Sequence, residues 1–130
     1  MDLKRIFEIQ TSGDFEELAL ETFSCQYREV TPYQEFCEHL GKSPANVERL
    51  EDIPFLPIEF FKTHRILKKG ISPAVVFRSS GTTGSQRSQH FVADLELYRE
   101  SFMPGFEYFY GPPSEYCILA LLPSYRERPD

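Results

Sequence analysis

The sequence predicts an α/β fold in which amino-terminal helices are followed by a mixed sheet. Helix signals dominate about residues 1–72, whereas about residues 73–130 contain short β-branched or aromatic runs and one amphipathic segment. The 130 residues correspond to one domain, and 41% of them are hydrophobic, which is enough to bury a core. We therefore treat residues 1–130 as one domain with a helical first part.

The first helix is expected to begin at Asp14. Its carboxylate can cap the helix. Glu17, three residues later, is placed to accept a hydrogen bond from the Asp14 backbone amide, as in a capping box. Apolar residues then follow at helical spacing, namely Phe15, Leu18, Ala19 and Phe23.

The second helix has a start and a stop signal. Thr31 is its expected cap, Pro32 occupies the first helical position, and Gln34 completes a capping box. Gly41 ends it. Its expected apolar face comprises Tyr33, Phe36, Cys37 and Leu40.

A third short helix is expected from Ser43-Pro44 through Val47 to Leu50. The next segment, 53–57, has two prolines in four residues, which predicts a stiff extended connector that lines the core. One helical turn is expected over 58–62.

The second part of the chain reads as strand, loop, strand, helix and strand. Segment 74–77 predicts a short buried strand, and 89–92 predicts a returning strand. Asp94 is the expected cap of the next helix, which Pro104 should kink or break and 111–113 should stop. The apolar run 116–122 predicts a strand covered on both faces.

Composition excludes several classes of function. The net charge of −6 with mixed signs gives no electrostatic footprint for nucleic acid, and Lys68-Lys69, the longest basic run, is expected to be a solvated turn. The amino terminus does not resemble a signal peptide, and no apolar run approaches a membrane span. A cytoplasmic location is the simplest expectation.

The cysteines and histidines give weak signals. No two of Cys25, Cys37 and Cys117 have a short metal-ligand spacing, so we expect reduced, mostly packed thiols and no metal site. Cys117 lies in the apolar run, where burial would disfavour a thiolate nucleophile. His90 could face a ligand from the returning strand, although a lone histidine is more often structural. His39 and His64 are weaker candidates for a ligand-binding role.

The most informative segment is the loop Ser79-Ser80-Gly81-Thr82-Thr83-Gly84-Ser85 between the two expected strands. Glycines allow a tight backbone, loop amides can form an anion-binding nest, and hydroxyls add donors for phosphate oxygens. The spacing fits neither a Walker loop, nor a dinucleotide fingerprint, nor a hydrolase elbow. Composition alone favours a flexible polar hairpin loop.

The string itself resembles the glycine-rich phosphate loop of adenylate-forming enzymes. The resemblance implies that Ser80, Gly81, Thr82, Thr83 and Gly84 grip the ATP phosphates, with Ser79 and Ser85 flanking them. Many members of that superfamily have a lysine just after this loop. Gln86 and Arg87 stand near that place here, so Arg87 is a candidate for the positive charge.

A closer resemblance, to the acyl-protein synthetase family, covers nearly the whole chain. It rests on segments 15–23, 53–62, 77–88 and 120–125. The family includes the fatty-acid ligase component of bacterial luminescence. The resemblance implies ATP-dependent, Mg-assisted activation of a long-chain fatty acid as an acyl-adenylate. The acyl group then passes to a cysteine thiol and onward to a reductase, so an acyl-CoA reductase-like protein is the implied partner.

Adenylate-forming enzymes are several times longer than 130 residues. The resemblance therefore implies an incomplete fragment of the large amino-terminal domain of such an enzyme. The adenine pocket, acyl tunnel, magnesium carboxylate, mobile lid and acylated cysteine would lie downstream, and no catalytic residue can be located. The chain alone is then expected to be inactive. The alternative is a non-catalytic module that binds a partner or associates with itself through uncovered apolar surface.

Overall fold

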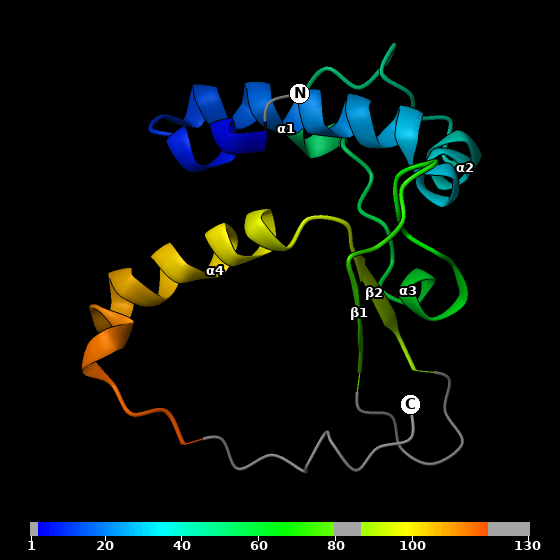
Figure 1. Cartoon of the computed structure of the whole chain (residues 1–130). Helices are drawn as coiled ribbons and strands as arrows, with labels where there is room; N and C mark the ends of the chain where they lie inside the picture. Colours follow the sequence, from blue (N-terminus) through cyan, green and yellow to red (C-terminus); the bar gives the residue numbers. More distant parts are fainter. Residues whose placement is uncertain (1–2, 80–86, 120–130) are drawn as a thin grey trace.

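The computed structural model describes residues 3–79 and 87–119 (Figure 1). Helices and a sheet are both present, and the sheet of the described residues has two antiparallel strands. The elements in order are η1 (Leu3–Glu8), α1 (Ser12–Glu29), α2 (Thr31–His39), η2 (Leu50–Asp52), α3 (Phe60–Thr63), β1 (Val75–Arg78), β2 (Gln89–Val92), α4 (Leu95–Tyr110) and η3 (Pro113–Glu115). Within the described ranges, no helix is long and apolar enough to cross a membrane.

Helix α1 begins earlier than the sequence predicts. Thr11 is its N-cap, because the Thr11 side chain accepts from the Asp14 amide at 3.1 Å while the Asp14 carboxylate accepts from the Thr11 amide at 2.9 Å. Asp14 is thus the N3 residue of a capping box whose N-cap is Thr11, so the expectation that Asp14 itself is the N-cap is wrong. Glu17 does not return a capping bond; it pairs with Arg5 of η1 at 3.0 Å.

Helix α2 follows α1 after the single residue Val30. Val30 has the extended backbone that an N-cap requires, so Thr31 is already helical and provides no cap. Gln34 completes no capping box; its side-chain amide donates to Glu38 at 3.0 Å. Gly41 ends the helix with a φ of 66°, as predicted, because this left-handed conformation suits glycine.

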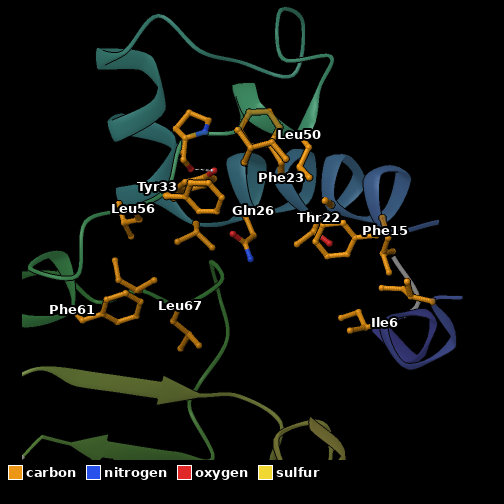
Figure 2. Close-up of a pocket in the computed structure, with 18 residues that line it drawn as sticks. Ile6, Phe15, Thr22, Phe23, Gln26, Tyr33, Leu50, Leu56, Phe61 and Leu67 are labelled. Atoms are coloured by element: carbon orange, nitrogen blue, oxygen red, sulfur yellow. Dashed lines mark hydrogen bonds between the residues drawn. The ribbon is translucent and has the colours of Figure 1, made fainter. Parts of the chain in front are cut away.

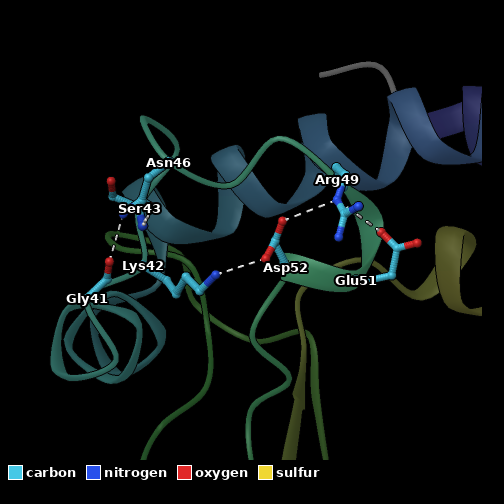
Figure 3. Close-up of polar contacts among 7 residues, drawn as sticks. All are labelled: Gly41, Lys42, Ser43, Asn46, Arg49, Glu51 and Asp52. Carbon is cyan, nitrogen blue, oxygen red and sulfur yellow. Dashed lines mark hydrogen bonds and ion pairs between the residues drawn. The ribbon is translucent and has the colours of Figure 1, made fainter.

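Residues 43–50 form a polar turn and not the expected third helix. The Asn46 side chain accepts from the Ser43 amide at 2.8 Å and donates to the Gly41 carbonyl at 2.8 Å (Figure 3). Such side-chain bonds to the backbone compete with helical hydrogen bonds. After the turn, Asp52 of η2 pairs with Lys42 at 3.0 Å, which ties the two ends of this segment together.

The core lies where α1, α2 and the following turn meet. Phe23, Tyr33, Cys37 and Val47 are buried there, and Cys37 has no exposed surface. Three of the four residues expected on the apolar face of α2 pack in or against this core, but Leu40 is 55% exposed, because the helix ends beside it.

The connector 53–57 lines the core as predicted. Ile53 and Leu56 pack against it, and the Tyr33 hydroxyl donates a 2.7 Å hydrogen bond to the Pro54 carbonyl. Phe55 is instead 82% exposed, at the edge of the apolar hollow along α1. The expected helical turn follows as α3.

Lys68 and Lys69 lie at an exposed turn, as expected, and both also contact the end of α1. The Lys69 amide donates to the Glu29 carbonyl at 2.7 Å, and Lys69 Nζ donates to the Arg28 carbonyl at 3.1 Å. Lys68 Nζ lies 3.8 Å from the Glu29 carboxylate. Two cations therefore lie at the carboxyl end of α1, where the helix dipole favours positive charge.

Helix α4 extends away from the hairpin on the same side as α1 (Figure 1). Asp94 caps it as predicted, since its carboxylate accepts from the amides of Glu96 and Leu97. The helix continues through Pro104, so Pro104 does not break it, and the alternative expectation of a kink stays a prediction. Gly111 ends it with a φ of 86°, again as predicted.

The expected buried strand over 116–122 is wrong for the part that is described. Residues 116–119 form no strand, and Ile118 and Leu119 are 71% and 86% exposed. A strand needs a backbone partner, and β1 and β2 pair with each other in the described part of the chain. Residues 120–122 lie outside the described ranges.

Candidate functional site

The hairpin that carries the predicted phosphate loop is formed by β1 and β2. Its register pairs Phe77 with His90 and Arg78 with Gln89. Beyond the last pair, the Ser79 amide donates to the Ser88 carbonyl at 3.1 Å, and the Ser88 amide donates to Ser79 Oγ at 3.1 Å. Ser88 is buried at this point. These reciprocal bonds hold the two strands together where the loop begins and ends.

Of the predicted phosphate-binding residues, Ser79 lies within the described structure. Its side-chain oxygen already accepts from Ser88, and its hydroxyl hydrogen can still donate to another group. The other six predicted residues, and Gln86, lie outside the described residues; the six are Ser80, Gly81, Thr82, Thr83, Gly84 and Ser85. Arg87 is exposed but engaged within the protein, so its assignment as the positive charge stays a prediction.

His90 has an aromatic partner. Its ring stacks on Phe61 with centroids 4.8 Å apart and planes 23° apart, and the residue is half-buried. One ring face is therefore occupied, which favours the structural interpretation of this histidine. His64 likewise stacks on Phe60 at 4.8 Å, and the His39 ring nitrogen Nδ1 donates to the Glu35 carbonyl at 2.7 Å.

An aromatic hollow of about 460 Å³ lies beside the hairpin. Phe77 of β1 and Tyr98 of α4 contact each other there, with ring centroids 5.2 Å apart. Phe61 and His90 line the same hollow. The hairpin thus presents an aromatic surface two residues from the Ser79–Ser88 closure.

A larger apolar cavity of about 590 Å³ lies along α1 (Figure 2). Its walls come from η1, α1, α2, η2, the connector, α3 and the segment before β1, and include Ile6, Phe15, Phe23, Leu56 and Phe61. The sequence analysis did not find this cavity. Its residues come from segments far apart in the sequence, so helical periodicity alone gave no signal for it.

Polar groups at the cavity are few. Thr22 and Gln26 face it from α1, and the hydroxyl of Tyr33 is occupied by Pro54. Burial raises the pKa of the Tyr33 phenol above its ordinary value, so this hydroxyl stays protonated. No charged side chain occurs among the described residues that line the cavity.

The three cysteines differ in exposure. Cys37 is buried, and burial raises the pKa of its thiol; Cys25 is half-buried. Cys117 is exposed, so the expectation that burial excludes it as a nucleophile is wrong. No disulfide joins these three residues. No group of three His, Cys, Asp or Glu side chains suited to a metal ion occurs in the described ranges.

Comparisons with protein-family models, curated proteins and solved structures find no match to this chain.

Proposed function

We propose that the chain carries the phosphate-binding loop of an ATP-dependent ligase that activates a long-chain fatty acid and passes the acyl group to a protein thiol. The observation that carries the proposal is the hairpin around the loop. The string Ser79–Ser85 stands between two antiparallel strands that Ser79 and Ser88 close with reciprocal hydrogen bonds. Backbone amides in a loop that connects two strands can form an anion-binding nest.

The proposed chemistry has two balanced steps. The fatty-acid carboxylate attacks the α-phosphorus of ATP, the bond to pyrophosphate breaks, and an acyl-adenylate forms. A cysteine thiolate then attacks the acyl carbonyl, and AMP leaves. The loop's role in the first step is to position the phosphates and to stabilise the charge on departing pyrophosphate. Loop amides and the hydroxyls of Thr82 and Thr83 are the proposed donors.

The described residues provide no cluster of metal ligands, so we assign no residue to the Mg²⁺ that accompanies ATP. The finer architecture is part of the same proposal. Residues 1–130 would form one adenylate-forming domain portion, with a helical part over about 1–72. About residues 73–130 would comprise the strand-loop-strand unit and the following helix and strand, and the strands would belong to a larger mixed sheet.

Nucleotide binding tests the proposal. Titration calorimetry of the chain with Mg-ATP and with pyrophosphate should show saturable binding. The Thr82→Ala/Thr83→Ala variant should lose it while keeping its circular dichroism spectrum. Thr63→Ala makes the same change at an exposed threonine of α3 and should bind like the parent chain. Unchanged binding in the double variant would contradict the proposal, and loss of folding would make the loop structural.

A second candidate is a non-catalytic, self-associating module. Large apolar side chains at the end of α4 and beyond are exposed: Tyr108 84%, Phe109 75% and Leu119 86%. Exposed patches of this kind mark association surfaces. Sedimentation that shows a concentration-dependent dimer, together with absent nucleotide binding, would favour this function over the ligase.

A further inference from the structure

The cavity along α1 has the dimensions of a ligand site. Its volume of about 590 Å³ lies within the range of roughly 300–1,000 Å³ that is typical of small-molecule pockets. It follows α1 from Phe15 to Gln26, a separation of eleven residues, or about 16 Å at the helical rise. An elongated hollow of this kind suits a linear molecule better than a fused ring system.

Two neutral polar side chains of α1, Thr22 and Gln26, face this hollow. The side-chain amide of Gln26 extends from α1 toward Phe61 and Leu67 (Figure 2). The remainder of the wall is apolar, apart from Thr22 and the occupied hydroxyl of Tyr33. None of these polar groups is charged, so the wall offers no counter-charge to a carboxylate.

The charge beside the cavity selects against an anion. A smaller hollow of about 210 Å³ shares Ile9 and Leu18 with the cavity. Its charged residues are Arg5, Glu8, Asp14 and Glu17, which sum to 1 − 3 = −2. The guanidinium of Arg5 is already held between Glu17 at 3.0 Å and Glu21 at 2.7 Å. A carboxylate at the end of the cavity beside Ile9 and Leu18 would meet like charge, which costs binding free energy.

Phe61 forms the wall between this cavity and the aromatic hollow at the hairpin. It lines both spaces, and its ring stacks on His90 at 4.8 Å. A chain that fills the cavity would therefore end at Phe61.

We propose that the cavity binds one neutral molecule with a single long alkyl chain, and that Phe61 sets the longest chain that fits. This inference rests on the cavity and not on the proposed ligase activity. The polar group of the ligand lies at the end of the cavity beside Ile9 and Leu18, and the alkyl chain packs along the apolar wall toward Phe61.

Displacement of the neutral fluorescent probe N-phenyl-1-naphthylamine by n-alkanols tests the proposal. We expect displacement at one site per chain, with each added methylene tightening binding about fourfold until a plateau, as burial of one CH₂ predicts. Dodecanol should bind more tightly than dodecanoate at neutral pH. Absence of saturable displacement, or tighter binding of the carboxylate, would overturn the proposal.

Matched variants locate the site. Ala19→Phe fills the cavity wall and should weaken alkanol binding at least tenfold, whereas Ala45→Phe in the exposed turn should not. Phe61→Ala should move the plateau to longer chains. Phe60→Ala removes a neighbouring ring that does not line the cavity and should leave the plateau unchanged. Equal plateaus for the parent chain and Phe61→Ala would refute the role of Phe61.

The two proposals fail separately. Thr82→Ala/Thr83→Ala changes no cavity residue and should bind alkanols like the parent chain. Intact alkanol binding without nucleotide binding would remove the proposed ligase function alone. Intact nucleotide binding without alkanol binding would remove the present inference alone.

Discussion

Ser79 and Ser88 are joined by two hydrogen bonds of 3.1 Å, one between backbone groups and one from the Ser88 amide to the Ser79 hydroxyl oxygen. The side-chain bond further stabilises the end of a hairpin whose strands have four residues each. Short two-stranded hairpins are marginal on their own, so one extra bond is a sizeable share of local stability.

Ser79→Ala should weaken the closure of the hairpin. The Ser88 amide loses its side-chain acceptor, which costs about 1 kcal/mol of local stability. Hydrogen exchange should show correspondingly faster exchange of the Ser88 amide. Ser79→Thr keeps the hydroxyl and should restore protection. Equal protection in the parent chain and Ser79→Ala would show that water replaces the serine oxygen without cost.

Tyr33→Phe should destabilise the helical part. The change removes the 2.7 Å bond to the Pro54 carbonyl, which fixes the connector to α2, at a cost of about 1 kcal/mol in the free energy of unfolding. Urea unfolding measures this loss. Tyr108→Phe makes the same change at an 84% exposed site and should alter stability by less than about 0.5 kcal/mol. Equal effects at the two sites would contradict the assigned bond.

Acid should destabilise the start of α1 through Asp14. The Thr11 side chain, then the amides of Thr11 and Gln10, lower the pKa of Asp14 by hydrogen bonding. A lowered folded-state pKa contributes stability that is present above the unfolded pKa of about 3.9 and is lost as pH falls through the folded value. Asp14→Asn should therefore show a smaller drop in melting temperature between about pH 6 and pH 2.

The matched control for this experiment is Glu48→Gln at an exposed carboxylate. It should lose as much melting temperature on acidification as the parent chain. A drop in Asp14→Asn as large as in the parent chain would mean that the capping box contributes nothing to acid sensitivity.

The cysteines should react with a thiol reagent in order of exposure. Cys117 should be modified first, Cys25 more slowly, and Cys37 after unfolding, because Cys37 is buried and its raised pKa disfavours the reactive thiolate. Mass spectrometry of peptides after timed alkylation measures the order. Rapid labelling of Cys37 in the folded chain would show that the core opens readily.

Local signals predicted part of the fold. β2, the Asp94 cap, and the helix ends at Gly41 and Gly111 follow from residues whose backbone chemistry is local. The start of α1 was misplaced, since Thr11 and Asp14 both suit a cap and the choice depends on the backbone before them. The turn at 43–50 was missed because the side chain of Asn46 decides it.

The strand expected over 116–122 is absent from its described part, 116–119, because hydrophobicity does not supply a pairing partner. The candidate site at the hairpin could also be predicted only in part. The sequence predicts the two strands around the loop and names Ser79, whereas the buried Ser88 that closes the hairpin gave no signal. The cavity depends on Phe23, Leu56 and Phe61 meeting in space, which no local pattern reveals.

The hydrogen bond from Lys69 to the Arg28 carbonyl at the end of α1 joins two residues that are 41 positions apart in the sequence. The chain between these two residues therefore forms a long loop that this contact closes. The entropy of closing such a loop grows only slowly with its length, so extra residues inserted near the exposed Ala45 should cost little. The corner between α1 and α2 joins neighbours in sequence and can form early in folding. Docking of the Lys69 segment requires the long closure, so we expect it to be a later step.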